Sequence, residues 1–455
     1  MNIRPTSIRY QMIGLAMLVA VLLYLDRICM STAAEAVAAD LKITKPQLDW
    51  LLGAFFWTYA LGQLPAGWLG DRYGARWMLG AYILLWSLCT GLMGIASTAS
   101  ILLALRLGCG LFEAGAYPVA ASIVRRWVPI ERRGFASSII ALGGRVGGAI
   151  APILTVQLML WFTLGSQWGT ASKDAVPDIT SWRPVMIIYG IAGIVIAILF
   201  MAIFRDWPDK HPQVNPAEVD LIRRGDPKLS ASVETRLAPP IREMILSLPM
   251  WMNSFVQFAS NMGWAFLVTK MPQYLKQVHD SPPLEQGWLQ SLPLVAGILG
   301  LLLGGLFTDR LTRSLGLRWG RSIAMFLSRL IVAFAFLGCL VVDSSFEATL
   351  CLALVGLATD LGTPACWAYG QDVGGRHVGS VVGWSNMWGN FGAALSPVCL
   401  GWIVAQFAID NDKSESAKRL ALEAGWHSAF VFCAILNVVA AVAALGINAS
   451  RPLRP

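Results

Sequence analysis

Residues 67–76 read GWLGDRYGAR, and residues 305–310 read GLFTDR, a second copy of the first part of this segment. Each copy lies at the end of an apolar run, at 48–69 and 285–308, that is long enough to cross a bilayer as a helix. The offset between the copies is about half of the 455-residue chain. A polar motif in the same place after two corresponding spans is not expected by chance, so the chain is predicted to consist of two similar halves.

The composition is that of a membrane protein. Hydrophobic residues make up 56% of the chain, charged residues make up 14%, and the mean hydropathy is +0.59. Soluble domains carry about 25% charged residues, so a chain this apolar is expected to lie in a lipid bilayer. The net charge of +8 is explained by basic loop residues that orient a membrane protein, and no nucleic-acid partner is expected.

Apolar runs of about 20 residues predict membrane-spanning helices. Twelve such runs are predicted, at 10–31, 48–69, 77–96, 100–122, 135–160, 185–204, 250–275, 285–308, 322–342, 347–368, 378–407 and 426–447. The fold class is therefore an all-α polytopic membrane protein with two pseudo-symmetric six-helix bundles. The predicted domains are an N-terminal bundle at 1–204, a polar linker loop at 205–245 and a C-terminal bundle at 246–455.

The distribution of basic residues predicts the orientation in the membrane. Arginines concentrate in the loops near Arg72, Arg125, Arg133 and Arg310 and in the linker. Loops rich in Arg and Lys stay in the cytoplasm, so both termini and the linker are predicted to be cytoplasmic, in a multi-pass protein of the cell inner (plasma) membrane. Two similar halves about an axis along the membrane normal form one architecture of secondary transporters, with the substrate bound near the midplane.

The spacing of Gly67, Asp71, Arg72, Gly74 and Arg76 resembles the signature loop of the major facilitator superfamily. The glycines permit tight helix packing, and Asp71 can pair with a basic residue or cap a neighbouring helix end. We expect a conformational role, as a cytoplasmic latch that breaks when the two halves rock. The alternative is a turn that only sets the topology.

Several other segments resemble the anion:cation symporter family of that superfamily, which includes bacterial galactonate, glucarate and hexuronate transporters. The matching segments are YLDR at 24–27, WTYALGQLPAG at 57–67, RLGCGLFEAGAYP at 106–118 and ERRG at 131–134. The resemblance covers nearly the whole chain and is densest in the first half. It implies a transporter of organic anions.

Asp26, Arg27, Arg106 and Glu113 are charged residues inside apolar runs. Each costs about 2.5–3.5 kcal/mol at membrane depth, so such residues are expected to face a protein interior or a water-filled cavity. The planar guanidinium of Arg27 suits a substrate carboxylate, and Asp26 and Glu113 are candidate proton carriers. Arg106 lies two helical turns before Glu113, and it is a candidate to pair with a carboxylate in the empty transporter.

The family resemblance implies the same roles for Arg27, Asp26 and Glu113. Two alternatives remain open for these charges. Arg27 can be a helix-end residue that snorkels to the membrane interface. The acidic residues and arginines can form a static intramembrane salt bridge that only holds the bundle together.

Neutral polar residues complete the predicted substrate site. Tyr59 matches a substrate-contacting tyrosine of the family, and its alternative role is packing. Asn261, Asn386 and Asn390 are suited to polyhydroxylated ligands, and their alternative role is interhelical hydrogen bonding worth about 1 kcal/mol.

Two basic residues depart from the family pattern. Arg145 stands where an uncharged residue is expected, and Lys270 stands where an aromatic residue is usual. Arg145 is included in the predicted substrate site, because the added charge fits a substrate with a second acidic group, such as an aldarate. Arg145 near a helix end and Lys270 near the outer surface are the alternatives, and the role of Asp360 stays open.

The sequence predicts no metal site, no cofactor and no enzyme activity, because its four histidines are scattered and it has no phosphate-binding loop. The expected partners are a small organic anion, protons and the lipid bilayer, and the chain is expected to be a monomer. The predicted function is proton-coupled symport of a sugar acid (hexonate, hexuronate or aldarate) into the cell by alternating access. An exchanger or facilitator without proton coupling, a non-transporting nutrient sensor and a membrane-embedded hydrolase are the alternatives.

Overall fold

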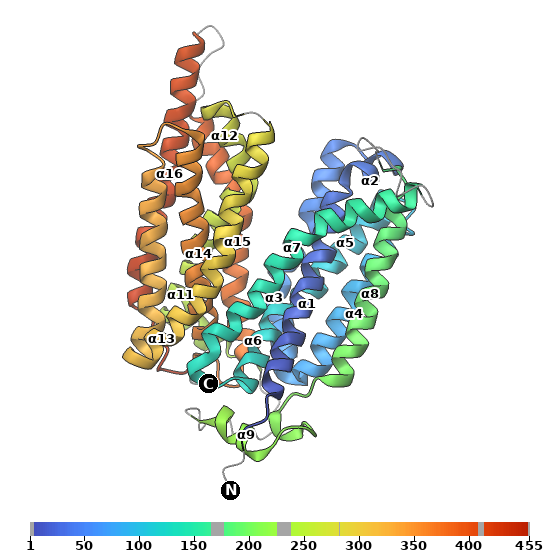
Figure 1. The fold of residues 1–455 in the computed structure, drawn as a ribbon, viewed down its shortest axis with the longest axis vertical. Coiled ribbons are helices and arrows are strands. Elements are labelled where there is room, and N and C mark those ends of the chain that lie inside the picture. Colours follow the sequence, from blue (N-terminus) through green and yellow to red (C-terminus); the bar gives the residue numbers. More distant parts are fainter. Residues whose placement is uncertain (1–3, 165–176, 225–237, 282, 408–413, 454–455) are drawn as a thin grey trace. The chain divides into compact units, whose positions relative to one another are not determined.

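The computed structural model describes residues 4–164, 177–224, 238–281, 283–407 and 414–453, and their regular structure is helical (Figure 1). In chain order the α-helices are α1 (Ile8–Thr32), α2 (Ala34–Asp40), α3 (Lys45–Tyr73), α4 (Ala75–Met93), α5 (Ala99–Glu113), α6 (Ala116–Trp127), α7 (Arg133–Leu164), α8 (Trp182–Ile203), α9 (Pro216–Arg223), α10 (Ile241–Leu246), α11 (Leu248–Thr269), α12 (Met271–His279), α13 (Pro283–Gly338), α14 (Ser345–Val373), α15 (Val378–Ala405) and α16 (Glu415–Leu445).

The longest helix, α13, is broken at Gly316, which has a φ of 77°. A straight helix of 56 residues would be about 84 Å long, nearly three times the roughly 30 Å hydrocarbon core of a bilayer. The break therefore converts α13 into two membrane crossings joined by a tight turn.

Among the described residues, nine helical segments are long and apolar enough to cross a membrane. One of these segments is α13, which supplies two crossings. Helices α3 and α11 supply two more, although they are less apolar. In α11 the polar residues Asn253, Ser254 and Gln257 are buried within the protein, which removes them from lipid. The twelve predicted crossings are thus all present as helices, and the predicted all-α fold is confirmed.

The chain forms two compact units. Unit 1 comprises Met1–Ile130, Ile139–Pro239 and Arg376–Gly383, and unit 2 comprises Glu131–Ser138, Pro240–Gly375 and Trp384–Pro455. The first turns of α7 and α15 therefore belong to a different unit from the rest of those helices. The boundaries predicted at 205–245 do not describe this exchange, and they stay a prediction.

Within unit 1, glycines allow the helices to approach closely. A Cβ atom on Gly190 of α8 would lie 2.6 Å from the Cα atom of Gly91 in α4, so only glycine fits at this crossing. A second contact joins α3 to α5, where Thr58 donates to the carbonyl oxygen of Leu107 at 2.8 Å. These contacts hold α3, α4, α5 and α8 together around a buried core that includes Phe55.

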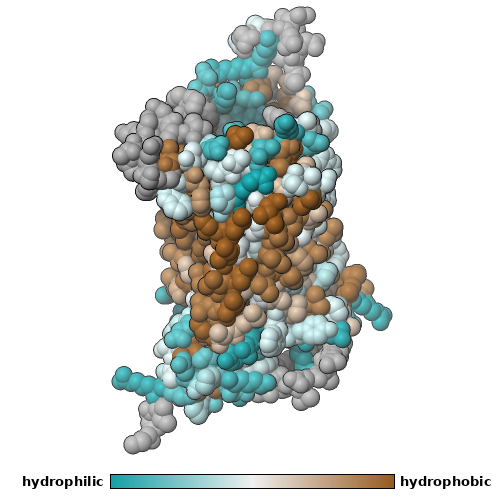
Figure 2. Space-filling view, turned by 90° about the vertical axis from the view of Figure 1, so that its right-hand side faces the viewer, coloured by the Kyte–Doolittle hydropathy of each residue, from teal (hydrophilic) through white to brown (hydrophobic). Residues whose placement is uncertain are grey.

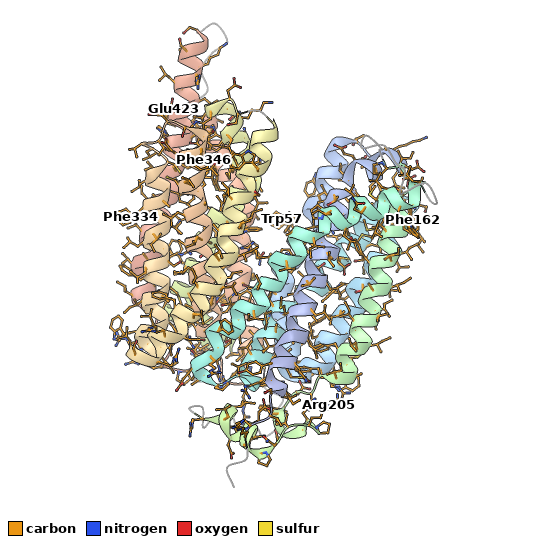
Figure 3. All side chains as sticks on the ribbon, in the orientation of Figure 1. Trp57, Phe162, Arg205, Phe334, Phe346 and Glu423 are labelled. Carbon is orange, nitrogen blue, oxygen red and sulfur yellow. The ribbon has the colours of Figure 1, made fainter. Side chains whose placement is uncertain are left out.

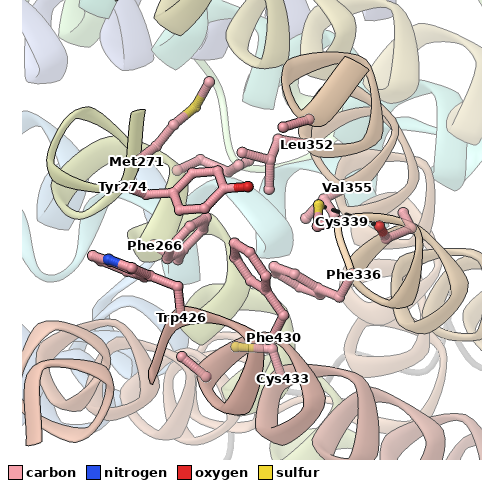
Figure 4. Packing of buried hydrophobic residues seen from close by; sticks show 14 of the residues in the cluster. Phe266, Met271, Tyr274, Phe336, Cys339, Leu352, Val355, Trp426, Phe430 and Cys433 are labelled. Atoms are coloured by element: carbon pink, nitrogen blue, oxygen red, sulfur yellow. Dashed lines mark hydrogen bonds between the residues drawn. The ribbon is translucent and has the colours of Figure 1, made fainter. Parts of the chain in front are cut away.

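Within unit 2, an aromatic cluster fills the space between α11, α12, α13 and α16 (Figure 4). The Phe430 ring meets those of Tyr274 and Phe266 edge-on, with centroid distances of 5.0 Å and 5.5 Å. Phe336 and Trp426 complete the cluster, and all five side chains are almost fully buried. Edge-to-face aromatic pairs add about 0.5–1.5 kcal/mol beyond the area they bury, so this cluster stabilises unit 2.

The outward surface of the helices is apolar. Phe334, Phe346 and Phe162 are exposed large side chains on the outside of the helices (Figure 3). On the face drawn in Figure 2, hydrophobic residues form a broad band between two hydrophilic ends. Contiguous apolar surface of this extent is not stable in water, and it matches the surface of a protein embedded in lipid.

The linker between α8 and α11 is anchored to unit 1 by two acidic residues. The carboxylate of Asp206 accepts hydrogen bonds from the backbone N–H of Ala75 at 2.6 Å and from Arg126 at 3.0 Å. The carboxylate of Glu218, in α9, accepts from the backbone N–H groups of Ile8 and Arg9 at 3.3 Å and 3.2 Å. Each carboxylate thus lies at the N-terminus of a membrane helix, where the helix dipole stabilises negative charge. Figure 1 shows α9 next to the start of α1.

Candidate functional site

The centre of the candidate site is a buried ion pair between α1 and α5. Arg27 donates to Glu113 from two nitrogens, Nη2 at 3.0 Å and Nε at 3.3 Å. The Arg27 side chain is 12% exposed and that of Glu113 is 1% exposed. Desolvated charges persist in such a place only with a close partner, so the pair neutralises two groups that sequence analysis had placed at membrane depth.

Aromatic rings surround the Arg27 guanidinium. It lies 4.3 Å from the ring centroid of Tyr59, 4.9 Å from that of Phe55 and 5.1 Å from that of Tyr24. The rings stabilise the cation by cation–π attraction and hold its planar fork in one orientation. The structure therefore brings Arg27, Tyr59 and Glu113 together, as sequence analysis expected.

Arg106 lies close to the backbone of α1. Its Nη2 atom lies 3.5 Å from the carbonyl oxygen of Arg27, and its guanidinium packs 4.8 Å from the centroid of the Phe55 ring. The hydrogen bonds to Glu113 come from Arg27, and the pairing of Arg106 with a carboxylate stays a prediction. Residues 106 and 113 share a face of α5, but Arg27 of the adjacent α1 reaches Glu113.

Asp26 occupies a separate environment on the next position of α1. Its Oδ2 atom accepts a hydrogen bond from Trp86 Nε1 at 3.0 Å, and the residue is 3% exposed. Consecutive helix residues point about 100° apart, which is why Asp26 faces α4 whereas Arg27 faces α5. The two candidate proton carriers, Asp26 and Glu113, therefore have different neighbours.

Three buried polar atoms around this centre have no hydrogen-bond partner among the described residues. They are Oδ1 of Asp26, Oε1 of Glu113 and Nε of Arg106. Leaving a polar group buried and unpaired costs about 1–3 kcal/mol. Such atoms are expected where a proton, a water molecule or a substrate group binds during the working cycle.

Arg145 lies beside the same tyrosines. It follows Gly144, where a Cβ atom would lie 2.5 Å from the hydroxyl of Tyr117 and 2.7 Å from the ring of Tyr24. Tyr117 is close enough to both Arg27 and Arg145 to interact with each electrostatically. The structure thus places Arg145 in the neighbourhood of Arg27, within unit 1.

The predicted asparagines lie in unit 2, on α11 and α15. Asn390 donates from Nδ2 to the carbonyl oxygen of Asn386 at 2.8 Å. Asn261 lies against α15, since a Cβ atom on Gly389 would lie 2.5 Å from its Nδ2 atom. The structure brings these asparagines together at one contact between two helices, which fits either proposed role.

Lys270 and Asp360 also lie in unit 2. Lys270 ends α11 as its C-cap and donates to Gln273 at 3.1 Å. Asp360 is 4% exposed, and its Oδ2 atom lies 2.6 Å from the position of a Cβ atom on Gly297. The roles of both residues stay predictions.

The predicted gating motif contains a helix cap. The Asp71 carboxylate accepts from the backbone N–H groups of Gly379 and Ser380 at 2.8 Å and 2.7 Å, in the first turn of α15. The carbonyl oxygen of Gly379 lies where a Cβ atom on Gly67 would be. Of the two interactions that the sequence allowed for Asp71, the structure thus shows the helix cap.

The other motif residues position the turn between α3 and α4. Gly74 has a φ of 89°, a conformation that favours glycine. Arg76 donates to the carbonyl oxygen of Met201 at 2.9 Å, and Arg72 lies 5.3 Å from the ring centroid of Trp68. These two arginines therefore contact groups around the turn between α3 and α4 and do not take part in the Asp71 cap.

The second copy of the motif forms an equivalent cap in unit 2. The Asp309 carboxylate accepts from the backbone N–H groups of Gly134 and Phe135, both at 3.0 Å, in the first turn of α7. Asp372 lies nearby and binds Arg133 and Arg321, each at 2.9 Å. The sequence repeat thus corresponds to a repeated interaction.

Sequence reasoning missed several residues of the Arg27 centre. Tyr24 precedes Arg27 by three positions and Phe55 precedes Tyr59 by four, and both spacings put side chains on one helix face. Trp86 and Tyr117 carried no such signal, because their partners lie on other helices.

The helical architecture, the repeated Asp caps and the buried ion pair are features of a transporter. The chain matches the family described as Major Facilitator Superfamily over residues 16–397 and 254–455. It belongs to this superfamily. The protein is therefore a multi-pass membrane transporter and not an enzyme.

Relatives within the superfamily match most of the chain. It is 30% identical to the probable sulfoacetate transporter SauU of Cupriavidus necator over 402 residues, which cover 87% of each chain. It is also 30% identical to the probable galactarate/D-glucarate transporter GudP of Bacillus subtilis over 419 residues, 88% of this chain and 87% of GudP. The D-galactonate transporter of Escherichia coli O6:H1 is 28% identical over 316 residues, 68% of this chain and 69% of that protein.

Solved structures of superfamily members share the fold. The proton:xylose symporter XylE matches with a TM-score of 0.69 and 13% identity, covering 95% of this chain and 94% of that chain. The human organic anion transporter MFSD10 matches with a TM-score of 0.66 and 14% identity, covering 96% of this chain and all of that chain (100%). These similarities support the major facilitator fold.

Proposed function

We propose that this superfamily member carries a sugar acid or a similar organic anion into the cell together with protons, by alternating access across the inner membrane. The relatives that cover most of the chain are named as transporters of sulfoacetate, galactarate, glucarate and galactonate, all of which are organic anions. The predicted orientation, with both termini in the cytoplasm, belongs to this proposal.

The single observation that carries the proposal is the Arg27–Glu113 ion pair. In the ion pair both Arg27 nitrogens donate to one Glu113 oxygen, Oε2, and a substrate carboxylate can take the place of Glu113 with two oxygen acceptors. Binding of the substrate therefore competes with the ion pair. Once it loses Arg27, a Glu113 carboxylate that stays buried is costly as an anion, and taking up a proton removes that cost. Anion binding and proton binding are linked in this way.

Asp26 provides a second place for a proton. Its Oδ1 atom is buried without a partner, and its Oδ2 atom is held by Trp86. A proton on Oδ1 would remove the charge while the Trp86 contact continues to orient the carboxyl group. We propose that Asp26 and Glu113 are both loaded before the substrate site changes its accessibility.

The Asp71 and Asp309 caps are the proposed latches. Each joins a turn between two membrane helices to the first turn of α15 or α7. Backbone hydrogen bonds to a carboxylate are strong but can re-form without any covalent step. We propose that these caps break and re-form as the two halves of the transporter rock.

The proposal is tested with purified protein in proteoliposomes. The outside medium is made more acidic than the inside, and uptake is measured for labelled glucarate, galactarate, galactonate and sulfoacetate. Uphill accumulation of at least one acid that collapses when a protonophore is added is the expected result. If protons that enter outnumber the negative charges of the substrate, an inside-negative potential adds about 2.3 kcal/mol per net charge per 100 mV.

Glu113→Gln separates the proposal from its rivals. The variant keeps the size and polarity of the side chain but cannot carry a proton. We expect it to lose gradient-driven accumulation while it still exchanges labelled for unlabelled substrate across the membrane. An exchanger or facilitator without proton coupling would give a variant that behaves like the unaltered protein. A nutrient sensor would bind the acids in the same preparation without any flux.

A further inference from the structure

We propose that Arg145 forms a second anion subsite next to Arg27, so that the transporter prefers acids that carry a negative group at both ends. This inference rests on the proposed function, because it names the class of organic anion that the same site takes. The class is a short, hydroxylated or unsubstituted chain with two carboxylates, or with one carboxylate and one sulfonate.

The first step is the position of α7 against α1. A Cβ atom on Gly147 would meet the carbonyl oxygen of Val21, and one on Gly143 would meet that of Met17. Glycines at these two positions let the helix axes come close. The neighbouring Arg145 is therefore carried on a helix that is in direct contact with α1, the helix that bears Arg27.

The second step is the group that lies between the two arginines. The Tyr117 hydroxyl lies 2.5 Å from the position of a Cβ atom on Gly144, directly before Arg145. The same tyrosine interacts electrostatically with Arg27 and with Arg145. Tyr117 is thus a common neighbour of Arg27 and Arg145.

The third step is the chemistry of this neighbourhood. Three tyrosines, Tyr24, Tyr59 and Tyr117, lie close to the Arg27–Arg145 region. Their hydroxyl groups can donate to and accept from the hydroxyl groups of a sugar acid, and each arginine can bind an oxyanion with its fork. Two forks with phenols close by match a ligand that has oxyanions at its ends and hydroxyl groups along its chain.

The fourth step concerns discrimination. A monoacid fills the Arg27 subsite and leaves a neutral hydroxymethyl group beside Arg145. A diacid places a charged oxyanion there instead. Hydrogen bonds to charged groups contribute about 1.5–3 kcal/mol, which corresponds to roughly 10- to 100-fold in affinity. Arg145 is therefore expected to decide between acids that differ only at their second end.

The test uses pairs of ligands that differ at one end only. Glucarate and gluconate differ by a carboxylate in place of a hydroxymethyl group, and sulfoacetate and isethionate differ in the same way. Binding of all four to the detergent-purified full chain is measured by calorimetry. We expect the unaltered protein to bind the diacid of at least one pair about tenfold or more tightly than its partner.

Arg145→Gln is the decisive variant. The variant should bind both acids of a pair with nearly equal affinity. The affinity for the diacid should fall, whereas the affinity for the monoacid should change less than about threefold. Arg145→Lys keeps the charge without the fork and should retain part of the preference. Arg183→Gln is the control for loss of an arginine, because Arg183 pairs with Asp40 at 2.7 Å in another part of unit 1. It should leave the preference unchanged.

Two results would overturn the subsite. An unchanged preference in Arg145→Gln would exclude a role in recognition, and equal weakening of both acids would indicate a structural role. If Arg145→Gln does not fold, the same comparison is made with Arg145→Lys, where an unchanged preference also counts against the proposal. A protein that binds and transports none of the acids would contradict the proposed function itself, which is a distinguishable outcome.

Discussion

Asp71 and Asp309 each cap the first turn of a helix that comes from a distant part of the chain. Asp71 accepts from the backbone at 379–380 and Asp309 accepts from the backbone at 134–135, with distances between 2.7 Å and 3.0 Å. Both aspartates end the second membrane crossing of their half. The two halves therefore repeat an interaction with the polypeptide backbone as well as a sequence motif.

The caps predict a stability effect. Asp71→Asn and Asp309→Asn remove the negative charge and one of the two acceptor oxygens, so each is expected to destabilise the protein by about 1–3 kcal/mol. Thermal unfolding of the purified variants in detergent measures this effect. Asp280→Asn is a suitable control, because Asp280 is exposed in a left-handed conformation that asparagine tolerates. A control that loses as much stability as the two cap variants would remove the case for the caps.

The close approach of Gly67 to the backbone of Gly379 gives a second prediction. Gly67→Ala places a methyl group where the Gly379 carbonyl oxygen lies, so we expect overpacking worth about 1–3 kcal/mol and a lower yield of folded protein. Gly14→Ala and Gly53→Ala meet nothing within 4 Å in the interior of a helix, and alanine there is expected to be neutral or stabilising by up to about 1 kcal/mol. Size-exclusion profiles and melting temperatures distinguish these outcomes, and equal behaviour of all three variants would contradict the packing argument.

The Arg9–Glu218 ion pair predicts that α9 is energetically coupled to the start of α1. The pair is 2.8 Å long, and the Glu218 side chain is completely buried. A double-mutant cycle with Arg9→Gln and Glu218→Gln should give a coupling of about 1–3 kcal/mol, measured by hydrogen exchange of the α9 amides. The Arg223–Asp209 pair of the same linker is 3.6 Å long and well exposed, and its cycle should give about 0–0.5 kcal/mol. Similar values for both pairs would show that burial does not matter here.

His211 predicts that the attachment of the linker between α8 and α11 to unit 1 depends on pH. The linker held in this way is called docked. Burial lowers the pKa of His211 from its ordinary value, with a further contribution from Arg205, whereas Glu218 acts in the opposite direction. The neutral ring accepts a hydrogen bond on Nδ1 from the backbone of Gln213 and packs edge-on against Trp127. The docked state therefore favours the unprotonated ring.

The sign follows from this lowered pKa. Docking is fully stable above the pKa of a free histidine, about 6.5, and loses stability as the pH falls below that value, because the undocked segment binds the proton more tightly. Limited proteolysis of the linker between pH 7.5 and 5.5 should show faster cleavage at the acidic end. His211→Gln should make the rate nearly independent of pH over this range, and a retained pH dependence would assign it to another group.

The sequence predicted the twelve crossings and the repeated motif because these signals are local. Runs of apolar residues report on lipid directly, and the Asp-Arg pair of each repeat is visible in a short window. The partner of Glu113 was not predicted. Helical spacing put Arg106 and Glu113 on one face of a helix, but Arg27 on α1 forms the ion pair, since spacing relates residues of one helix and does not show what an adjacent helix contributes.

The sequence of the linker contains a helix-start pattern from which α9 could have been predicted. It was expected to be a loop, but it contains α9, which begins with Asn215 as N-cap, Pro216 in the first turn and Glu218 three residues after the cap. This pattern is a helix-start signature. The contact of Glu218 with α1 could not be predicted in the same way, because it joins residues about 210 positions apart.

Gly316, at the break in α13, separates two reasons for which a protein retains glycine. Nothing lies within 4 Å of where its Cβ atom would be, but its φ of 77° disfavours other residues. Substitution is therefore opposed by the local backbone alone, and the strain is about 1–3 kcal/mol for a residue other than glycine. With a ψ of 174° this is a backbone conformation that essentially only glycine adopts, so even small replacements such as alanine and asparagine should be poorly tolerated, and a library at this position should retain glycine whatever the side-chain volume.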